Sequence, residues 1–160
     1  MSDNFLRFVA TDPEALPGSA RTARARDIVA ERLPRADVVE VGRFSSVNFI
    51  DCGGNLESAR CPSCGADLLS DGTWTRLLER AWESGMSKRR FTLACCAASH
   101  ALEGLDYRWP VAFGRFSIDA RNPGVDWFHP DRELGYEARE LSSEVASTLG
   151  TEVTAIWQHI

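Results

Sequence analysis

Lysine and long apolar runs are scarce in this chain, and each shortage narrows its possible functions. Its 160 residues carry 18 lysines and arginines, of which only Lys88 is a lysine, against 23 aspartates and glutamates, for a net charge of −5. Because nucleic-acid binding requires a surplus of basic groups that neutralise phosphates, this balance argues against a general nucleic-acid binder. No stretch is apolar enough for a signal peptide or a membrane helix, and the first residues, Met1-Ser2-Asp3-Asn4, lack a positive charge, so we expect a cytoplasmic protein.

Common catalytic motifs are missing as well. The sequence has no Gly-x-Ser-x-Gly, no phosphate-binding Gly-Lys-Ser/Thr and no Gly-x-Gly-x-x-Gly, so the frequent hydrolase, NTPase and dinucleotide-binding classes have no motif in their support. None of its 3 histidines forms the His-x-Glu pattern that zinc deaminases combine with their cysteines. The sequence therefore favours a protein that is not an enzyme.

One specific motif is present, the run Cys61-Pro62-Ser63-Cys64-Gly65. Two cysteines separated by two residues allow a tight turn to direct both thiolates at one ion, and glycine after the second cysteine adopts the left-handed conformation such turns use. In a reducing cytosol, cysteines are more often ligands or buried thiols than disulfides. Because a structural zinc ion takes four ligands in a tetrahedron, this turn supplies half a site.

Cys95 and Cys96 are the expected second half, about 30 residues further along the chain. The predicted ligand set of a structural zinc ion is therefore Cys61, Cys64, Cys95 and Cys96. Adjacent side chains on a regular strand point to opposite faces, so both can bind one ion only if the backbone turns sharply there. His100 is the main alternative to one of these cysteines, and Cys52 is a weaker one.

The hydrophobic pattern predicts an α+β protein with a mixed or antiparallel sheet and about three helices. We expect one domain over residues 1–160, with a zinc-ribbon-like element at about 52–105 inserted within it. One possible arrangement is a split β-α-β sandwich whose first and last strands lie in one sheet. Trp74 and Trp82 recur at helical spacing and are expected to be buried together. Helices are expected at 20–33, 73–84 and 131–149, and strands at 5–11, 38–41, 47–51, 91–94, 113–121 and 152–159.

The segment from Cys95-Cys96 through Tyr107-Arg108-Trp109-Pro110, together with the upstream Cys-Pro-x-Cys, resembles a group of uncharacterised bacterial zinc-ribbon-like proteins. The likeness covers roughly residues 61–123. It implies a metal-stabilised fold, without an activity. Those proteins tend to have glycine after the double cysteine, where this chain has Ala97, and this difference argues against a second turn that mirrors the first.

Two aromatic loops are further candidates for function. The first places His129 beside Asp126 and Asp131, which is compatible with acid–base chemistry or with an ordinary loop that begins a helix. The second, residues 105–110, is compatible with a binding surface or with packing against the cysteine turn.

Three functional hypotheses follow. The first is a zinc-stabilised cytosolic protein that acts by binding another protein, for example an inhibitor or an immunity-type partner of a basic toxin. The second is an enzyme of unknown reaction that uses the loop of His129. The third is a zinc-ribbon nucleic-acid binder that uses the arginines of residues 21–26 and 88–90 on one common face.

Overall fold

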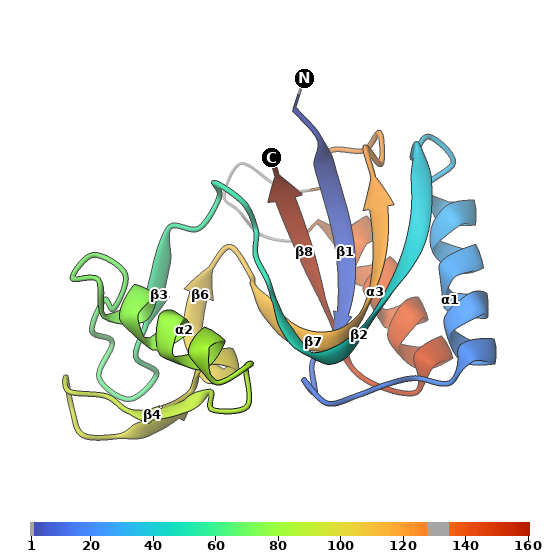
Figure 1. Ribbon diagram of the computed structural model, residues 1–160. Coiled ribbons are helices and arrows are strands. Elements are labelled where there is room, and N and C mark those ends of the chain that lie inside the picture. Colours follow the sequence, from blue (N-terminus) through green and yellow to red (C-terminus); the bar gives the residue numbers. More distant parts are fainter. Residues whose placement is uncertain (1, 128–134) are drawn as a thin grey trace.

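The computed structural model describes residues 2–127 and 135–160 of the chain (Figure 1). The elements are, in chain order, β1 (Asn4–Ala10), α1 (Ser19–Arg32), β2 (Val38–Ile50), β3 (Ser58–Arg60), α2 (Thr73–Glu83), β4 (Arg90–Thr92), β5 (Ser99–Ala101), the 3-10 turn η1 (Leu102–Gly104), β6 (Asp106–Arg108), β7 (Ala112–Arg121), α3 (Tyr136–Leu149) and β8 (Val153–His159). Among the described residues, none of the helices combines the length and the apolar character that crossing a bilayer requires.

The main sheet has four strands in the order β2-β7-β1-β8, and each strand is antiparallel to its neighbours. The first and last strands pair over seven residues, from Asn4 opposite His159 to Ala10 opposite Val153. Helices α1 and α3 are the two crossovers of this β-α-β-β-α-β order, which is the split β-α-β sandwich. The predicted α+β class is confirmed.

Alternation along the strands gives the sheet two different faces. One face carries Leu6, Phe8, Phe116 and Ile118, and helices α1 and α3 cover it. The helices contribute residues spaced three or four apart, the spacing that forms one apolar stripe on a helix. The buried residues of this helix-side core are Leu6, Phe8, Ala25, Val29, Leu33, Phe116, Ile118, Ala120, Leu141, Val145, Leu149 and Ala155.

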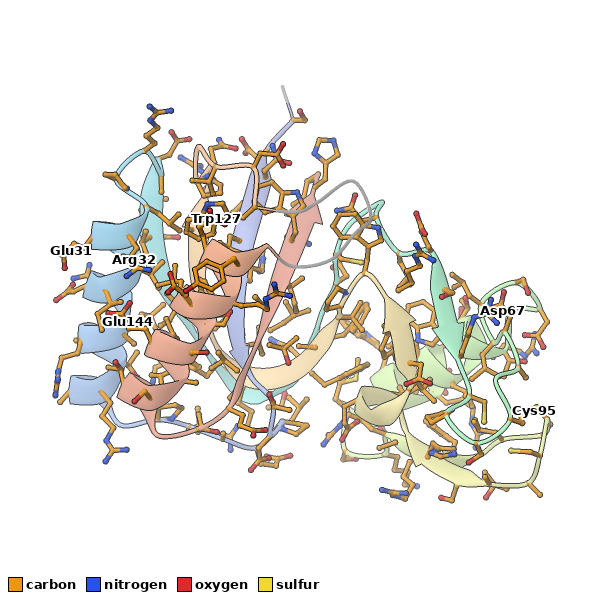
Figure 2. The ribbon with its side chains drawn as sticks, turned by 180° about the vertical axis from the view of Figure 1, so that it is seen from behind. Glu31, Arg32, Asp67, Cys95, Trp127 and Glu144 are labelled. Carbon is orange, nitrogen blue, oxygen red and sulfur yellow. The ribbon has the colours of Figure 1, made fainter. Side chains whose placement is uncertain are left out.

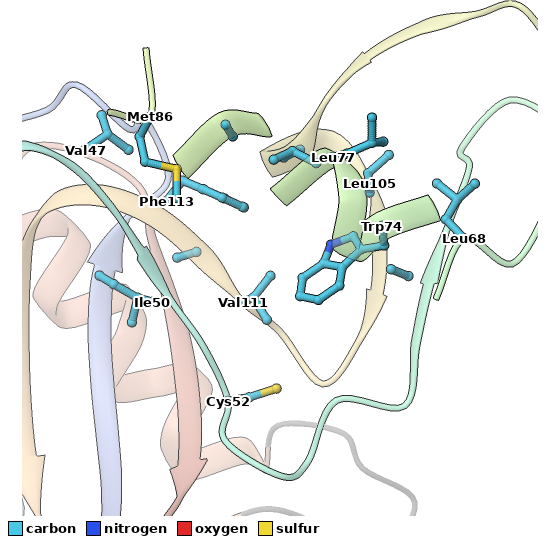
Figure 3. Close-up of a cluster of buried hydrophobic side chains, with 14 of the residues drawn as sticks. Val47, Ile50, Cys52, Leu68, Trp74, Leu77, Met86, Leu105, Val111 and Phe113 are labelled. Atoms are coloured by element: carbon cyan, nitrogen blue, oxygen red, sulfur yellow. The ribbon is translucent and has the colours of Figure 1, made fainter. Parts of the chain in front are cut away.

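Residues 51–111 form an insertion between β2 and β7, and the figure shows it beside the sheet, away from α1 and α3 (Figure 1). It holds α2 and two small sheets, β3 with β6 and β4 with β5. Trp74 of α2 belongs to a second core (Figure 3). The centroid of its ring lies 5.8 Å from that of Phe49, in an edge-on arrangement. Val9, Phe113 and Ile156 from the sheet belong to the same core, so the insertion is packed onto the sandwich.

Two expectations from the sequence were wrong. The predicted strands 38–41 and 47–51 are one 13-residue strand, β2, whose pairing with β7 shifts between Arg43 and Asn48. Such a bulge lets a strand bend without ending, so the polar run Ser45-Ser46 is not a hairpin turn. Trp82 is 65% exposed, whereas Trp74 is buried, so the α2 stripe buries one tryptophan and not two. The predicted start of the third helix lies outside the described residues.

Polar contacts fix the insertion to the sandwich at two places. At one sheet edge, Gly53 bridges to His159, and the Asn55 side chain donates to the carbonyl of Trp157. A Cβ on Gly53 would lie 2.0 Å from the His159 carbonyl oxygen, so only glycine fits there. At the second place, the guanidinium of Arg89 lies between Glu103 of the insertion and Glu14 of the segment between β1 and α1. These contacts orient the cysteine turns relative to the sheet.

Candidate metal centre

The first cysteine turn follows β3. The Cys61 N–H donates to the Ala66 carbonyl at 3.0 Å, and the Gly65 N–H donates to the Cys61 carbonyl at 2.8 Å. Gly65 has a φ of +74°, the left-handed conformation expected from the sequence. The Cys61 thiol is buried beneath the turn, whereas Cys64 is exposed at its end.

The second turn joins β4 to β5 and repeats this hydrogen-bond pattern. The Leu93 N–H donates to the Ala98 carbonyl at 2.9 Å, and the Ala97 N–H donates to the Leu93 carbonyl at 2.8 Å. Leu93 therefore occupies the place of Cys61, Cys96 that of Cys64, and Ala97 that of Gly65, with a φ of +61°. The argument from Ala97 against a matching second turn was wrong, because alanine adopts the left-handed conformation here.

This geometry explains how two adjacent cysteines face one point. Strand β4 ends at Thr92 and β5 begins at Ser99, so Cys95 and Cys96 lie in the turn and not on a strand. Cys95 takes the position of Ser63 in the first turn, one residue before the ligand that the two turns share. The second turn thus replaces a first-position cysteine with buried Leu93 and supplies its second sulfur from Cys95.

The four sulfurs of the two turns converge, with all Sγ atoms within 4.8 Å of one another. Cys61 Sγ lies 3.6 Å from Cys96 Sγ, and Cys95 Sγ lies 3.9 Å from Cys96 Sγ. A tetrahedral ion with metal–sulfur bonds of about 2.3 Å requires sulfurs about 3.8 Å apart. The cluster lies at the end of the insertion far from the sandwich, where Cys95 is labelled (Figure 2). It can hold a metal ion without rearrangement of the backbone.

The electrostatics of the cluster also favour a cation. Burial raises the pKa of Cys61, but hydrogen bonds from the backbone N–H groups of Cys64 and Ser63 and from the thiols of Cys64 and Cys96 together outweigh it and lower the pKa from 9.0 to about 7. Burial and the neighbouring thiols raise the pKa of Cys95 to about 12. One thiolate therefore forms readily, and further negative charge beside it is disfavoured unless a positive ion offsets it.

The two alternative ligands lie outside this set of sulfurs. His100 Nε2 shares a hydrogen bond with Ser63 Oγ at 2.8 Å, so it links the two turns from the side. Cys52 is buried, its Sγ donates to the Trp109 carbonyl at 3.8 Å, and burial raises its pKa to about 11. The side chains of both residues form other hydrogen bonds. The donor set in the described part of the chain is therefore four thiols.

The aromatic loop at 105–110 packs inside the insertion. Strand β6 pairs with β3, which leads directly into Cys61. The Tyr107 hydroxyl accepts from Trp74 Nε1 at 3.1 Å and donates to the Leu102 carbonyl at 2.7 Å. This loop therefore supports the first cysteine turn through backbone pairing and one buried hydroxyl.

Of the predicted acid–base loop, His129 and Asp131 lie outside the described residues. Asp126 lies at the end of the sheet near β1 and β8, in a shallow pocket of about 390 Å³ that Asn4, Asn122 and Trp157 also line. The described side chains of this pocket include amides, an aromatic ring and one carboxylate. They do not form a nucleophile paired with a base.

The two arginine groups of the nucleic-acid hypothesis do not share a face. Residues 21–26 belong to α1, on the side of the sheet away from the insertion that holds residues 88–90 (Figure 1). Arg26 pairs with Asp27, and the Arg89 side chain is only 13% exposed between its glutamates. This dispersed arrangement counts against phosphate binding along one surface.

Comparisons of the chain with models of protein families, with curated proteins and with solved structures find no match.

Proposed function

We propose that this chain is a cytosolic binding protein without enzymatic activity, whose inserted segment is stabilised by a structural zinc ion on Cys61, Cys64, Cys95 and Cys96. The observation that carries the proposal is the convergence of these four sulfurs within 4.8 Å from two separate turns. The partner is another protein. An inhibitor or immunity-type protein that neutralises a basic toxin is one form of this function.

Zinc is the metal that best matches the donor set. Thiolates are soft ligands that select zinc, copper(I) or iron–sulfur clusters over magnesium or calcium, and a tetrahedral set of four is typical of structural zinc. A closed set of four protein ligands leaves no open position for water or substrate. The ion would therefore contribute folding free energy and not catalysis.

The short strands of the insertion make a stabilising ion useful. Its strands β3, β4, β5 and β6 have three residues each, and two-stranded pieces of this size are marginal in water. The two cysteine turns end different small sheets, so one ion would link β3 with the β4–β5 hairpin. Metal binding then couples directly to folding of the segment.

Binding to a protein partner is supported by charge and by exposed aromatic surface. The chain carries a net charge of −5, which suits a basic partner through long-range attraction. Trp82 is 65% exposed on α2, between the exposed Glu79 and Glu83. Tryptophan is enriched among the residues that dominate binding energy at interfaces. The described residues contain no paired nucleophile and base that would favour an enzyme instead.

Metal analysis of the purified protein and of a Cys64→Ser variant tests the first part of the proposal. We expect about one zinc ion per chain in the parent, a clear loss of zinc in the variant and a lower unfolding midpoint. Glu83→Gln is the control, because it changes an exposed side chain of the insertion and removes neither a sulfur nor the hydrogen bond between Ser63 and His100. Equal zinc content and equal stability of Cys64→Ser and the parent would defeat the metal assignment.

The second part requires the partner itself. Affinity purification from the source cells, with partners identified by mass spectrometry, should recover one protein of basic isoelectric point in a constant ratio to the chain. A chain that elutes alone under these conditions would contradict the binding function, whatever its zinc content.

A further inference from the structure

The sheet face opposite the helices carries an unusual set of polar groups. In the described part of the chain, the buried side-chain nitrogen and oxygen atoms without a protein partner all belong to this face, which we call the open face. Buried polar groups normally have hydrogen-bond partners, so a concentration of exceptions on one face needs a physical reason. The atoms are Arg7 Nε, Arg115 Nε, Ser117 Oγ, Asp119 Oδ1 and Gln158 Oε1.

The centre of the open face is a row of charged residues across three strands. Glu40 on β2 lies opposite Asp119 on β7, which in turn lies opposite Arg7 on β1. Asp119 Oδ2 pairs with Arg7 Nη1 at 3.4 Å, while its Oδ1 is buried without a partner. Like charges directly opposite one another destabilise an antiparallel pair, yet Glu40 and Asp119 are placed so.

Two further carboxylates near this row already have partners. Asp37 pairs with Arg121 at 3.7 Å, and Asp51 accepts from Gln158 Nε2 on β8 at 2.9 Å. Glu40 is exposed and has no ion pair within the described residues. Glu40, on the β2 half of the face, is therefore the carboxylate of this row that is open to a cation from outside.

The start of β2 is the part of this half that the protein leaves open. The insertion packs on Val47 and Ile50 in the second part of β2 and on Val9, Phe113 and Ile156 of the other strands, whereas Val38 and Phe5 are only half-buried. Phe44 lies over Gly42 near Ser117 and forms an apolar border. The result is an exposed carboxylate on Glu40 beside a half-buried carboxylate on Asp119, bordered by aromatic and aliphatic side chains.

We propose that the β2 half of the open face is the docking surface for a basic segment of a protein partner, with an arginine or lysine seated between Glu40 and Asp119. A guanidinium offers five N–H donors in a planar fork, which suits the exposed carboxylate of Glu40 and the half-buried carboxylate of Asp119. Apolar residues flanking that cation pack against Phe5, Val38 and Phe44. This inference rests on the proposed protein-binding function and names its surface and the chemistry of its partner.

The probe is a capped octapeptide of alternating arginine and valine, titrated into the intact zinc-loaded protein and followed by amide NMR shifts. We expect saturable binding with shifts confined to β2, β7 and β1, and an affinity about tenfold weaker in Glu40→Gln, because one close charge pair is lost. The matched control is Glu31→Gln on α1, an exposed glutamate on the helix side, which should bind as the parent does. A peptide with glutamate in place of arginine should not bind.

Three outcomes would contradict the proposed docking surface. The first is the absence of saturable binding, and the second is a set of NMR shifts on α1, α3 or the cysteine turns. The third is equal weakening of the affinity by Glu40→Gln and Glu31→Gln, which would indicate diffuse charge attraction. Glu40→Lys separates this inference from the proposed function. If the native partner is still recovered with Glu40→Lys in an unchanged ratio, the protein-binding function stands and the open face is not its surface.

Discussion

Ala97 holds a backbone conformation that most residues avoid. Its φ of +61° lies in the left-handed region, where the side chain approaches the following carbonyl. This conformation costs a non-glycine residue about 1–2 kcal/mol, part of which glycine gives back through its greater freedom in the unfolded chain. The second cysteine turn is therefore strained where the first, with Gly65, is not.

Ala97→Gly should stabilise the folded protein by up to about 1 kcal/mol, because glycine accepts the left-handed conformation. Chemical denaturation of the zinc-loaded protein measures this difference. Ala94→Gly, in the same turn but without a positive φ, serves as the control and should be neutral or destabilising. Loss of stability in Ala97→Gly would show that the turn is not strained there.

Asp119 is the second residue whose surroundings oppose its usual state. Burial raises the pKa of its carboxyl, Arg7 and the nearby Ser117 hydroxyl lower it, and Glu40 raises it, with a net increase. A carboxyl whose pKa is raised in the folded protein favours its neutral form, so its contribution to stability is greatest at low pH and declines as the pH rises through the folded pKa. A binding surface can retain such a cost where a partner relieves it.

Asp119→Asn should therefore gain stability relative to the parent as the pH rises from about 3 to 7, since asparagine does not titrate. Urea unfolding at several pH values measures the difference between the two proteins. Asp37→Asn is the comparison, because Asp37 is paired with Arg121 and more exposed. A pH-independent difference between Asp119→Asn and the parent would contradict the raised pKa.

Within the insertion, α2 and β6 are joined by one buried hydroxyl. Tyr107 accepts from the Trp74 indole and donates to the carbonyl of Leu102 at the 3-10 turn. Burial raises the pKa of Tyr107, so the hydroxyl stays neutral and keeps its proton for the carbonyl. The packing of α2 against β6 depends on this hydroxyl, because the two small sheets are too short to keep α2 in place by themselves.

Tyr107→Phe should destabilise the insertion by about 1–3 kcal/mol, since it leaves a buried indole N–H without its partner and removes one hydrogen bond to the Leu102 carbonyl. Hydrogen exchange of the α2 amides reports the loss. Tyr136→Phe is the matched control, because that residue is 65% exposed and, among the described residues, its hydroxyl donates to Glu140. Equal α2 protection in the two variants would rule out a structural role for the Tyr107 hydroxyl.

At the scale of the whole molecule, the chain has two cores that meet at the sheet. The helix-side core contains no residue from 51–111, whereas the core of the insertion borrows Val9, Phe113 and Ile156 from the sheet. The sandwich can therefore keep its helix-side packing when the insertion loses order. The insertion depends on the sheet and, under the proposed function, on the metal.

Removal of zinc with a chelator should disorder residues 51–111 and leave α1, α3 and β1 folded. Amide NMR spectra recorded before and after chelation test this, with zinc added back as the control for reversibility. We expect that only the amide signals of the insertion lose their chemical-shift dispersion, since structural metal binding is coupled to folding of the segment that holds the ligands. Unfolding of α1 and α3 together with the insertion would show a single cooperative unit.

Local signals in the sequence predicted much of this molecule. The spacing of Cys61 and Cys64 with Gly65 predicted a turn that the structure forms, because three or four adjacent residues determine such a turn. Helical periodicity placed α1 within one residue of its observed range, and alternation predicted the strand at β7. The α+β class followed from these elements together.

Other features depended on contacts between residues far apart in sequence. The sequence does not reveal that Leu93 occupies the position in the second turn that Cys61 occupies in the first, because the two turns share backbone hydrogen bonds and not side-chain types at this position. Trp82 shares the spacing of buried Trp74, and only the packing of α2 against the sheet decides which ring is covered. Periodicity identifies a stripe, but it does not say how wide the covering surface is.

The sequence by itself determined the short-range chemistry of this protein: the turn from Cys61 to Gly65, an acidic balance and the order of its longer helices and strands. The tertiary structure alone decided that four sulfurs meet within 4.8 Å, and that the carboxylates of Glu40 and Asp119 lie opposite each other on an open sheet face. The reason is physical. A turn is fixed by the φ and ψ preferences of a few neighbouring residues, whereas the pairing of strands brings together positions whose side chains carry no mark of their partners.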